Sequence, residues 1–132
     1  MSQENVEIVR RTVDAFNRRD LDAAGQDMDP DVEVDWSRSP GVEAGIYRGG
    51  RAVRDFWNTF LQTWERIAVS VDEFIDCGES VVVPNRTHFW GRDGIEVEAY
   101  GVSVVTVRDG RVVYWRLFRE LEDALKSVGV EG

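Results

Sequence analysis

The sequence predicts an α+β fold, a cone-shaped barrel in which three helices pack on a strongly curved, mostly antiparallel sheet and enclose a pocket. Three observations lead to this class. Segments with helical apolar periodicity come first and strand-like runs follow them. The tripeptide Arg-Asp-Gly occurs twice, ending at Gly94 and Gly110, and Asp-Gly between strand-like runs is a strong hairpin signal. A sheet with one apolar and one polar face can then close against the helices.

The first quarter of the chain predicts two helices. One apolar stripe with helical spacing consists of Val6, Val9, Val13 and Phe16. This stripe predicts a helix over about Gln3–Arg18. Asp20 is placed to cap a short second helix, Leu21–Met28. Pro30 then breaks the chain.

The middle of the chain predicts a strand, a loop, a helix and a second strand. Alternation of valine with acidic residues predicts the first strand, with Val32, Val34 and Trp36 on one face. Ser37–Gly50 is rich in glycine and is typical of a loop. Aromatic and aliphatic residues at 3–4 spacing predict a helix over about Arg51–Arg66. A strand follows over about Ala68–Asp76.

The last third predicts a three-stranded meander. The two Arg-Asp-Gly turns separate strands at about Ser80–Gly91, Ile95–Val107 and Arg111–Arg119. Leu121–Val128 predicts a short last helix that Gly129 stops. No linker, repeat or low-complexity stretch interrupts these elements, so residues 1–132 are interpreted as one domain.

Composition narrows the possible partners and compartment. The formal net charge of −9 argues against nucleic acid and against an anionic membrane. The chain begins without a signal-peptide pattern and has no apolar run of about 20 residues, which favours a cytoplasmic protein. The only cysteine, Cys77, cannot form an internal disulfide and is interpreted as an ordinary buried residue.

The sequence predicts no metal and no cofactor. Acidic residues are frequent between Asp27 and Asp35, but the run lacks the glycine and terminal glutamate of a calcium loop. One histidine and one cysteine give no zinc-type spacing. No phosphate-binding or dinucleotide-binding fingerprint is present.

Four segments carry a family pattern: Val9–Ala23, Asp29–Trp36, Tyr47–Trp57 and Val105–Val113. They resemble the SnoaL-like and ketosteroid isomerase-like members of the nuclear transport factor 2-like superfamily. The resemblance covers essentially the whole chain. It implies a single SnoaL-like domain and a homodimer formed through the outer sheet face. It is specific for the fold and poor for the activity, because the superfamily hosts isomerases, cyclases, dehydratases, hydrolases and non-enzymes.

The resemblance also assigns site residues. It matches Asp35 to the general base of ketosteroid isomerases, and Thr12 and Ser103 to their oxyanion-hole positions. Hydroxyl groups donate more weakly to an enolate than the residues they replace, which argues against a true steroid isomerase. A solvated strand carboxylate is the alternative for Asp35.

The same match predicts which side chains face the pocket. On the three meander strands it places inward Val82, Pro84, Arg86, His88 and Trp90, then Val97, Ala99, Gly101, Ser103 and Val105, then Val113, Trp115, Leu117 and Arg119. The small residues Ala99 and Gly101 would leave room for a ligand. The alternative is a bulge at Gly94 or Gly110, which would reverse the local facing, bring Asn85, Thr87 and Tyr100 into the pocket and remove His88 from it.

Two inward residues then become candidate catalytic groups beside Asp35. His88, the only histidine, can transfer protons near neutral pH. Arg86 can stabilise an oxyanion. An ion pair between Arg86 and Asp35 is the alternative; it would weaken Asp35 as a base and leave His88 as the proton carrier.

The predicted function is binding of a small hydrophobic carbonyl-type compound with cofactor-independent proton transfer, namely isomerisation, cyclisation or dehydration. Catalysis would use Asp35, His88 and Arg86. The expected ligand-binding residues are Thr12, Phe16, Trp36, Phe56, Trp57, Phe60, Trp90, Ser103, Trp115, Leu117 and Arg119. A non-catalytic binder and a structural domain filled by its own aromatic side chains are the alternatives.

Overall fold

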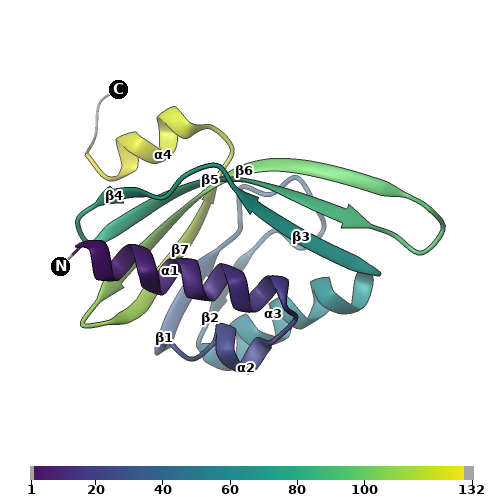
Figure 1. The fold of residues 1–132 in the computed structure, drawn as a ribbon, viewed down its shortest axis with the longest axis horizontal. Helices are drawn as coiled ribbons and strands as arrows, with labels where there is room; N and C mark the ends of the chain where they lie inside the picture. The colour runs from purple at the N-terminus through teal and green to yellow at the C-terminus, as the bar shows by residue number, and fades with distance from the viewer. Residues whose placement is uncertain (1, 130–132) are drawn as a thin grey trace.

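A curled, unclosed sheet has three helices on one side and one helix on the other. The computed structural model describes residues 2–129, and within them a seven-stranded sheet has helices α1, α2 and α3 on one side and α4 on the other (Figure 1). We call the side toward α1 and α3 the inner face and the side toward α4 the outer face. The predicted α+β class is confirmed, with the last helix on the outer face rather than among those that cover the inner one.

Three of the four helices begin and end within about three residues of the predicted positions, whereas the second ends four residues before its predicted end at Met28. The bounds are Ser2–Asn17 for α1, Leu21–Ala24 for α2, Gly50–Thr63 for α3 and Leu121–Ser127 for α4. The Asp20 side chain accepts a hydrogen bond from the Ala23 amide at 3.0 Å, so it caps α2 as expected. Among the described residues, no helix is long and apolar enough to cross a membrane.

The strands include the predicted meander and two short strands that the sequence did not indicate. Their bounds are Met28–Asp35 for β1, Ile46–Arg48 for β2, Arg66–Val71 for β3, Ile75–Cys77 for β4, Ser80–Trp90 for β5, Glu96–Arg108 for β6 and Arg111–Phe118 for β7. β2 lies inside the segment expected to be a loop. β4 follows a break in the strand expected over Ala68–Asp76.

The strand order across the sheet is β2-β1-β7-β6-β5-β3, with β4 also paired to β5. Only the β1–β7 pairing is parallel among the described strands. The turn between β6 and β7 has positive φ at both Asp109 (52°) and Gly110 (75°), which is the conformation that tight hairpins favour. The Asp-Gly signal at this turn therefore predicted the hairpin correctly.

Strand register corrects the predicted facing of β5. β5 and β6 pair without interruption from Ser80 opposite Thr106 to Trp90 opposite Glu96, so Val83 lies opposite Ser103. Paired residues share a face of the sheet. Since Val83 belongs to the core on the inner face, the five β5 residues predicted to point inward point outward: Val82, Pro84, Arg86, His88 and Trp90.

The other two strands of the meander largely agree with the prediction. Ser103 and Val105 share the inner face with Leu117 and Trp115, their partners on β7. The pairing shifts between Thr106 and Val107, so alternation does not extend to Val113. Arg119 lies beyond the end of β7 and is exposed.

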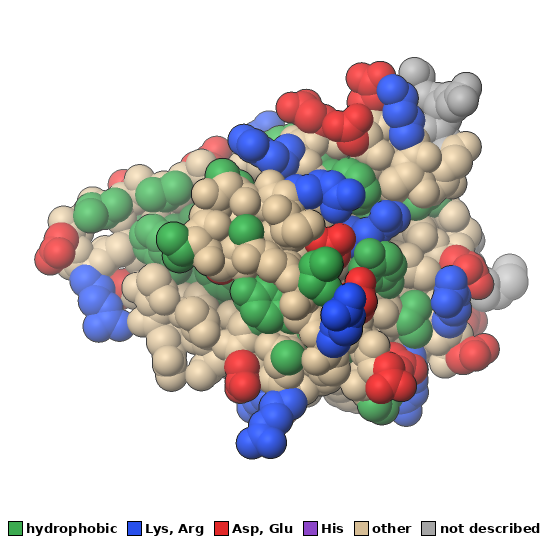
Figure 2. All heavy atoms as spheres, turned by 180° about the vertical axis from the view of Figure 1, so that it is seen from behind, with side chains coloured by type: hydrophobic (Ala, Val, Ile, Leu, Met, Phe, Trp, Pro, Cys, Tyr) green, Lys and Arg blue, Asp and Glu red, His purple; other side chains and the backbone are tan. Residues whose placement is uncertain are grey.

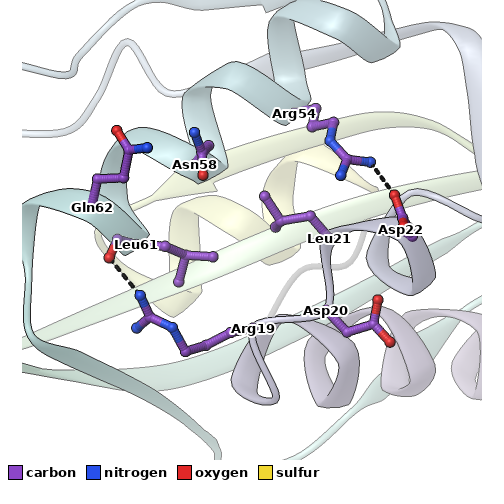
Figure 3. A pocket seen from close by; sticks show the side chains of 8 residues that line it. All are labelled: Arg19, Asp20, Leu21, Asp22, Arg54, Asn58, Leu61 and Gln62. Carbon is purple, nitrogen blue, oxygen red and sulfur yellow. Dashed lines mark hydrogen bonds and ion pairs between the residues drawn. The ribbon is translucent and has the colours of Figure 1, made fainter.

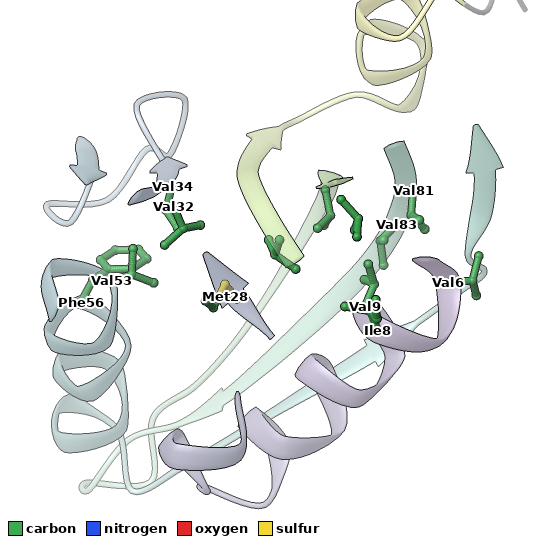
Figure 4. Close-up of a cluster of buried hydrophobic side chains, with 13 residues drawn as sticks. Val6, Ile8, Val9, Met28, Val32, Val34, Val53, Phe56, Val81 and Val83 are labelled. Atoms are coloured by element: carbon green, nitrogen blue, oxygen red, sulfur yellow. The ribbon is translucent and has the colours of Figure 1, made fainter. Parts of the chain in front are cut away.

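The main core fills one half of the inner face (Figure 4). Side chains from α1, α3 and the sheet make a continuous apolar cluster, whose labelled members are Val6, Ile8, Val9, Met28, Val32, Val34, Val53, Phe56, Val81 and Val83. A second, smaller cluster lies on the outer face, where α4 covers β5 and β6. It consists of Val82, Val102, Val104, Phe118 and Ala124.

Candidate functional site

The three predicted catalytic residues lie on the outer face, and the structure does not bring them together. Asp35 pairs in register with Arg116 on β7, next to Val34, which points into the inner core. Arg86 and His88 lie on β5, and the order of strands places β7 and β6 between β5 and β1. The predicted grouping of these residues in an inner pocket is therefore wrong, and so is the alternative ion pair between Asp35 and Arg86.

Asp35 is held as a carboxylate by its own turn. Its Oδ1 accepts hydrogen bonds from the Ser37 amide at 3.0 Å and from the Ser37 hydroxyl, and its Oδ2 lies 3.6 Å from Nη1 of Arg38. Burial alone would raise the pKa of Asp35. The hydrogen bonds from Ser37 and the charges of Arg38 and Arg116 outweigh burial, and the net pKa is lowered. A carboxylate with a lowered pKa is a weak base.

His88 belongs to a stacked, solvent-facing group. Its ring lies 4.0 Å from that of Trp90, and Arg66 covers Trp90 with its guanidinium carbon 4.6 Å from the ring centroid. Nε2 of His88 is 3.1 Å from Oε1 of Glu96. Arg86 is exposed and forms no hydrogen bond or ion pair within residues 2–129. These contacts describe a polar surface rather than an enclosed catalytic site.

Aromatic rings line the inner face between α3 and the sheet. The Trp36, Phe56 and Phe60 rings contact one another in sequence, with centroids 5.7 Å and 5.1 Å apart. Phe60 then lies 6.3 Å from Phe89, which lies 5.0 Å from Trp64. Phe56 is buried, whereas the other four are only half-buried, so the row extends from the core to the solvent.

Neutral polar groups are the other feature of this inner surface. Asn85 and Thr87 are half-buried, and Ser103 is 4% exposed. The inner positions of β5 from Val81 to Phe89, and their partners on β6 from Val97 to Val105, include no charged residue. This part of the inner face therefore offers hydrogen bonds without charge.

Gly101 does not leave the space expected from its size. A Cβ at this position would lie 3.0 Å from Cδ1 of Leu117, so the Leu117 side chain fills that gap. Thr12 is buried, and its hydroxyl donates to the Ile8 carbonyl at 3.0 Å, which satisfies it within α1. Ala99 remains exposed and leaves the sheet surface open beside Thr87, its partner on β5.

Most of the predicted ligand-binding residues do lie on the inner side. Phe16 and Trp57 contact each other, 6.3 Å apart, where α1 meets α3. Of the predicted set, Trp90 faces outward and Arg119 lies exposed beyond the end of β7.

The predicted ligand-binding set left out five inner residues, which are Tyr47, Trp64, Asn85, Thr87 and Phe89. Of these, Asn85 and Thr87 were expected inside only in the alternative of a bulge at a turn glycine. Asn85, Thr87 and Phe89 face inward because the β5–β6 turn has three residues, with the Gly91 amide donating to the Ile95 carbonyl. A two-residue turn at Asp93-Gly94 would instead pair His88 with Ala99, which is the facing that was predicted.

Two adjoining cavities lie elsewhere, between α2 and α3. They measure about 330 and 250 Å³ and share the side chains of Leu21, Asp22 and Arg54. Figure 3 shows the larger one, where Nη1 of Arg54 meets Oδ1 of Asp22 at 2.6 Å and Nη2 of Arg19 donates to the Leu61 carbonyl at 2.7 Å. Neither cavity includes any of the predicted catalytic residues. The larger one is lined mainly by charged and amide side chains, whereas the smaller one also has apolar walls from Met28, Val53 and Trp57.

No metal centre is evident in the part of the chain that the structure describes. Within residues 2–129, no group of three or more His, Cys, Asp or Glu side chains is arranged to hold an ion.

Comparison with solved structures places the fold among known proteins. An NTF2-like protein of unknown function from Burkholderia pseudomallei is 25% identical, with a TM-score of 0.78 over 96% of this chain and 98% of that one. A Mycobacterium tuberculosis protein in complex with estradiol-17beta-hemisuccinate is 18% identical, with a TM-score of 0.78 over 89% and 95%. An LEH-like epoxide hydrolase from M. tuberculosis is 19% identical, with a TM-score of 0.73 over 96% and 85%.

Sequence comparison gives the family. No curated protein matches the chain. The model of the SnoaL-like domain matches residues 9–115, which is most of the chain and includes α2, α3 and the inner face of the sheet. The chain therefore belongs to the SnoaL-like domain family, within the NTF2-like superfamily.

Proposed function

We propose that this protein binds a small, uncharged, hydrophobic molecule against the inner face of β5 and β6, beyond the end of α1. One observation carries the proposal: half-buried aromatic rings and neutral hydrogen-bonding groups share this surface, and no charge lies among them. Phe60, Trp64 and Phe89 provide flat apolar contacts. Thr87 and Asn85 lie beside them and suit a carbonyl or hydroxyl oxygen.

The exposure of the surface supports binding rather than a purely structural core. Val97 is 42% exposed and Ile95 is 58% exposed, although both lie at the end of a hairpin whose inner side is apolar. Exposed apolar groups of this kind gain free energy when a ligand covers them, by about 25 cal/mol per Å². Figure 2 shows hydrophobic side chains gathered over this end of the molecule, at the left of that view.

The proposal favours a binder over a proton-transfer enzyme. Asp35, His88 and Arg86 point to the opposite face, so none of them can reach a molecule held beside Thr87. One structural neighbour was crystallised with estradiol-17beta-hemisuccinate, which supports testing steroid-like compounds.

The homodimer expected from the family resemblance would use a restricted surface. Helix α4 covers Val82, Val102 and Val104 on the outer face. We propose that any pairing of two copies through this face uses the part that α4 leaves bare, around Arg86 and Tyr100, of which Tyr100 is 47% exposed.

Nile red, a flat and uncharged dye, tests the binding proposal. We expect saturable binding, with a rise in dye fluorescence. Glutamate introduced at Thr87 puts a charge on the inner face and should weaken binding at least about tenfold, because burying that charge is costly. Glutamate at His88, the next residue on the same strand, faces outward and should change the affinity by less than about twofold.

The same two variants, Thr87→Glu and His88→Glu, also show which result would contradict the binding proposal. Circular dichroism and melting temperature first show that both variants are folded. If His88→Glu weakens dye binding and Thr87→Glu does not, the ligand lies on the outer face and the proposal is wrong.

A further inference from the structure

Arg116, on the outer face of β7, is a cation that shares one carboxylate with a second arginine and has no ion pair of its own among the described residues. Its Nε atom is buried and donates no hydrogen bond to any residue of 2–129, and no ion pair with Arg116 forms within that range. A half-buried guanidinium without a hydrogen-bonded anion is unfavourable. Among residues 2–129, Nε of Arg116 is the only buried side-chain nitrogen or oxygen without a hydrogen-bond partner.

The acidic residues nearest Arg116 are engaged with other groups. Asp35 is its register partner on β1, yet the Asp35 carboxylate is held by Ser37 and lies 3.6 Å from Arg38. Glu33, two residues earlier on the same strand, accepts from Nε of Arg48 at 2.8 Å. One carboxylate, that of Asp35, therefore serves two guanidinium groups. The site keeps a positive charge in a chain whose net charge is −9.

Aromatic side chains hold both guanidinium groups in place. The guanidinium carbon of Arg116 lies 5.1 Å from the centroid of Tyr114 and 5.2 Å from that of Phe118. The guanidinium carbon of Arg38 lies 4.5 Å from the centroid of the same Phe118 ring. Stacking of this kind fixes the plane of an arginine and leaves its N–H groups free for an anion. The Arg38 side chain is 43% exposed, so solvent reaches the pair.

We propose that Arg38 and Arg116 together bind a carboxylate on the outer face. Paired guanidinium groups recognise the two oxygens of a carboxylate through charge-assisted hydrogen bonds. The carboxylate comes either from a free small acid or from an acidic side chain of a second copy of this chain. The site is independent of the inner surface, because the two lie on opposite faces of the sheet.

Titration with sodium benzoate tests the proposal through side-chain ¹⁵N NMR of the arginine Nε–H groups. We expect a saturable shift of the Arg116 signal. Arg38→Met, in an exposed turn, should weaken binding about tenfold, and Arg116→Met at least as much. Arg111→Met, at the exposed opposite end of β7, is the control and should leave the affinity within about twofold.

Sedimentation velocity distinguishes the two sources of the carboxylate. A dimer that benzoate and Arg38→Met both dissociate identifies a second copy as the source, and a monomer that binds benzoate identifies a free acid. Both results support the site. If the protein is monomeric and the Arg116 signal ignores benzoate but moves when Asp35 is changed to Asn, Asp35 alone neutralises Arg116 and the proposal is overturned.

Discussion

The inner face of the sheet has two halves that differ in almost every physical respect, although the same strands build both. In the half under α1, Val81, Val83 and Val105 are at most 1% exposed. In the other half, Thr87 and Phe89 are half-buried and Val97 is 42% exposed. The first half is a sealed core, and the second is an open apolar surface.

Element lengths explain the difference. Helix α1 has 16 residues and extends about 24 Å at about 1.5 Å per residue. Strand β6 has 13 residues and extends about 44 Å at about 3.4 Å per residue. The hairpin of β5 and β6 therefore extends beyond the helix, as Figure 1 shows where these two strands continue past α1. The uncovered length leaves an apolar surface available to a ligand without any special loop.

The largest expected effect comes from the same truncation made in each half. Phe56→Ala removes a 5% exposed ring in contact with Trp36, Tyr47 and Phe60, and should lower the free energy of unfolding by about 3–5 kcal/mol. Phe89→Ala removes a half-buried ring and should cost about 1–2 kcal/mol. Urea denaturation measures both. Equal losses would contradict the division into a sealed and an open half.

Replacing Asp35 by Asn should lower the free energy of unfolding by less than the core truncation does. Unlike the effect of that truncation, this effect should depend on pH. Asp35→Asn removes the charge that Ser37 and Arg38 stabilise and should cost about 1 kcal/mol at pH 7. Because the pKa of Asp35 is lowered in the folded protein, its contribution is present above the unfolded pKa of about 3.9 and is lost as pH falls through the folded pKa.

Unfolding curves of wild type and Asp35→Asn between pH 7 and acid conditions test this account. The gap between the two proteins should begin to narrow below the unfolded pKa of about 3.9 and should close once pH falls below the lowered folded pKa of Asp35. A gap that stays constant with pH would mean that the stabilisation at Asp35 does not involve its charge.

The sequence predicted the elements of the fold more reliably than the faces of its strands. Long periodic segments and Asp-Gly turns fixed α1, α3 and the meander, because each carries many residues of one pattern. β2 and β4 have three residues each, too few for any alternation to show. They form because neighbouring strands supply hydrogen-bonding edges, and such neighbours are not evident from a local pattern.

The predicted site was wrong because the facing of its strand residues was taken from the family match. On β1, alternation with Val34 already places Asp35 on the face opposite the core. On β5, unbroken pairing with β6 places His88 opposite Glu98, on the outer face. A register error of one residue moves every side chain of a strand to the other face. The prediction therefore placed Arg86 and His88 inside, where the structure has Asn85 and Thr87.

Methyl NMR of alanine-labelled protein during a Nile red titration tests the central claim most directly. Ala99 lies on β6, on the inner face opposite Thr87 of β5. Ala68 lies on β3, on the outer face opposite His88 of β5. We predict that the Ala99 methyl signal shifts in a saturable way while that of Ala68 stays in place. A shift of Ala68 with Ala99 unmoved would contradict binding on the open half of the inner face.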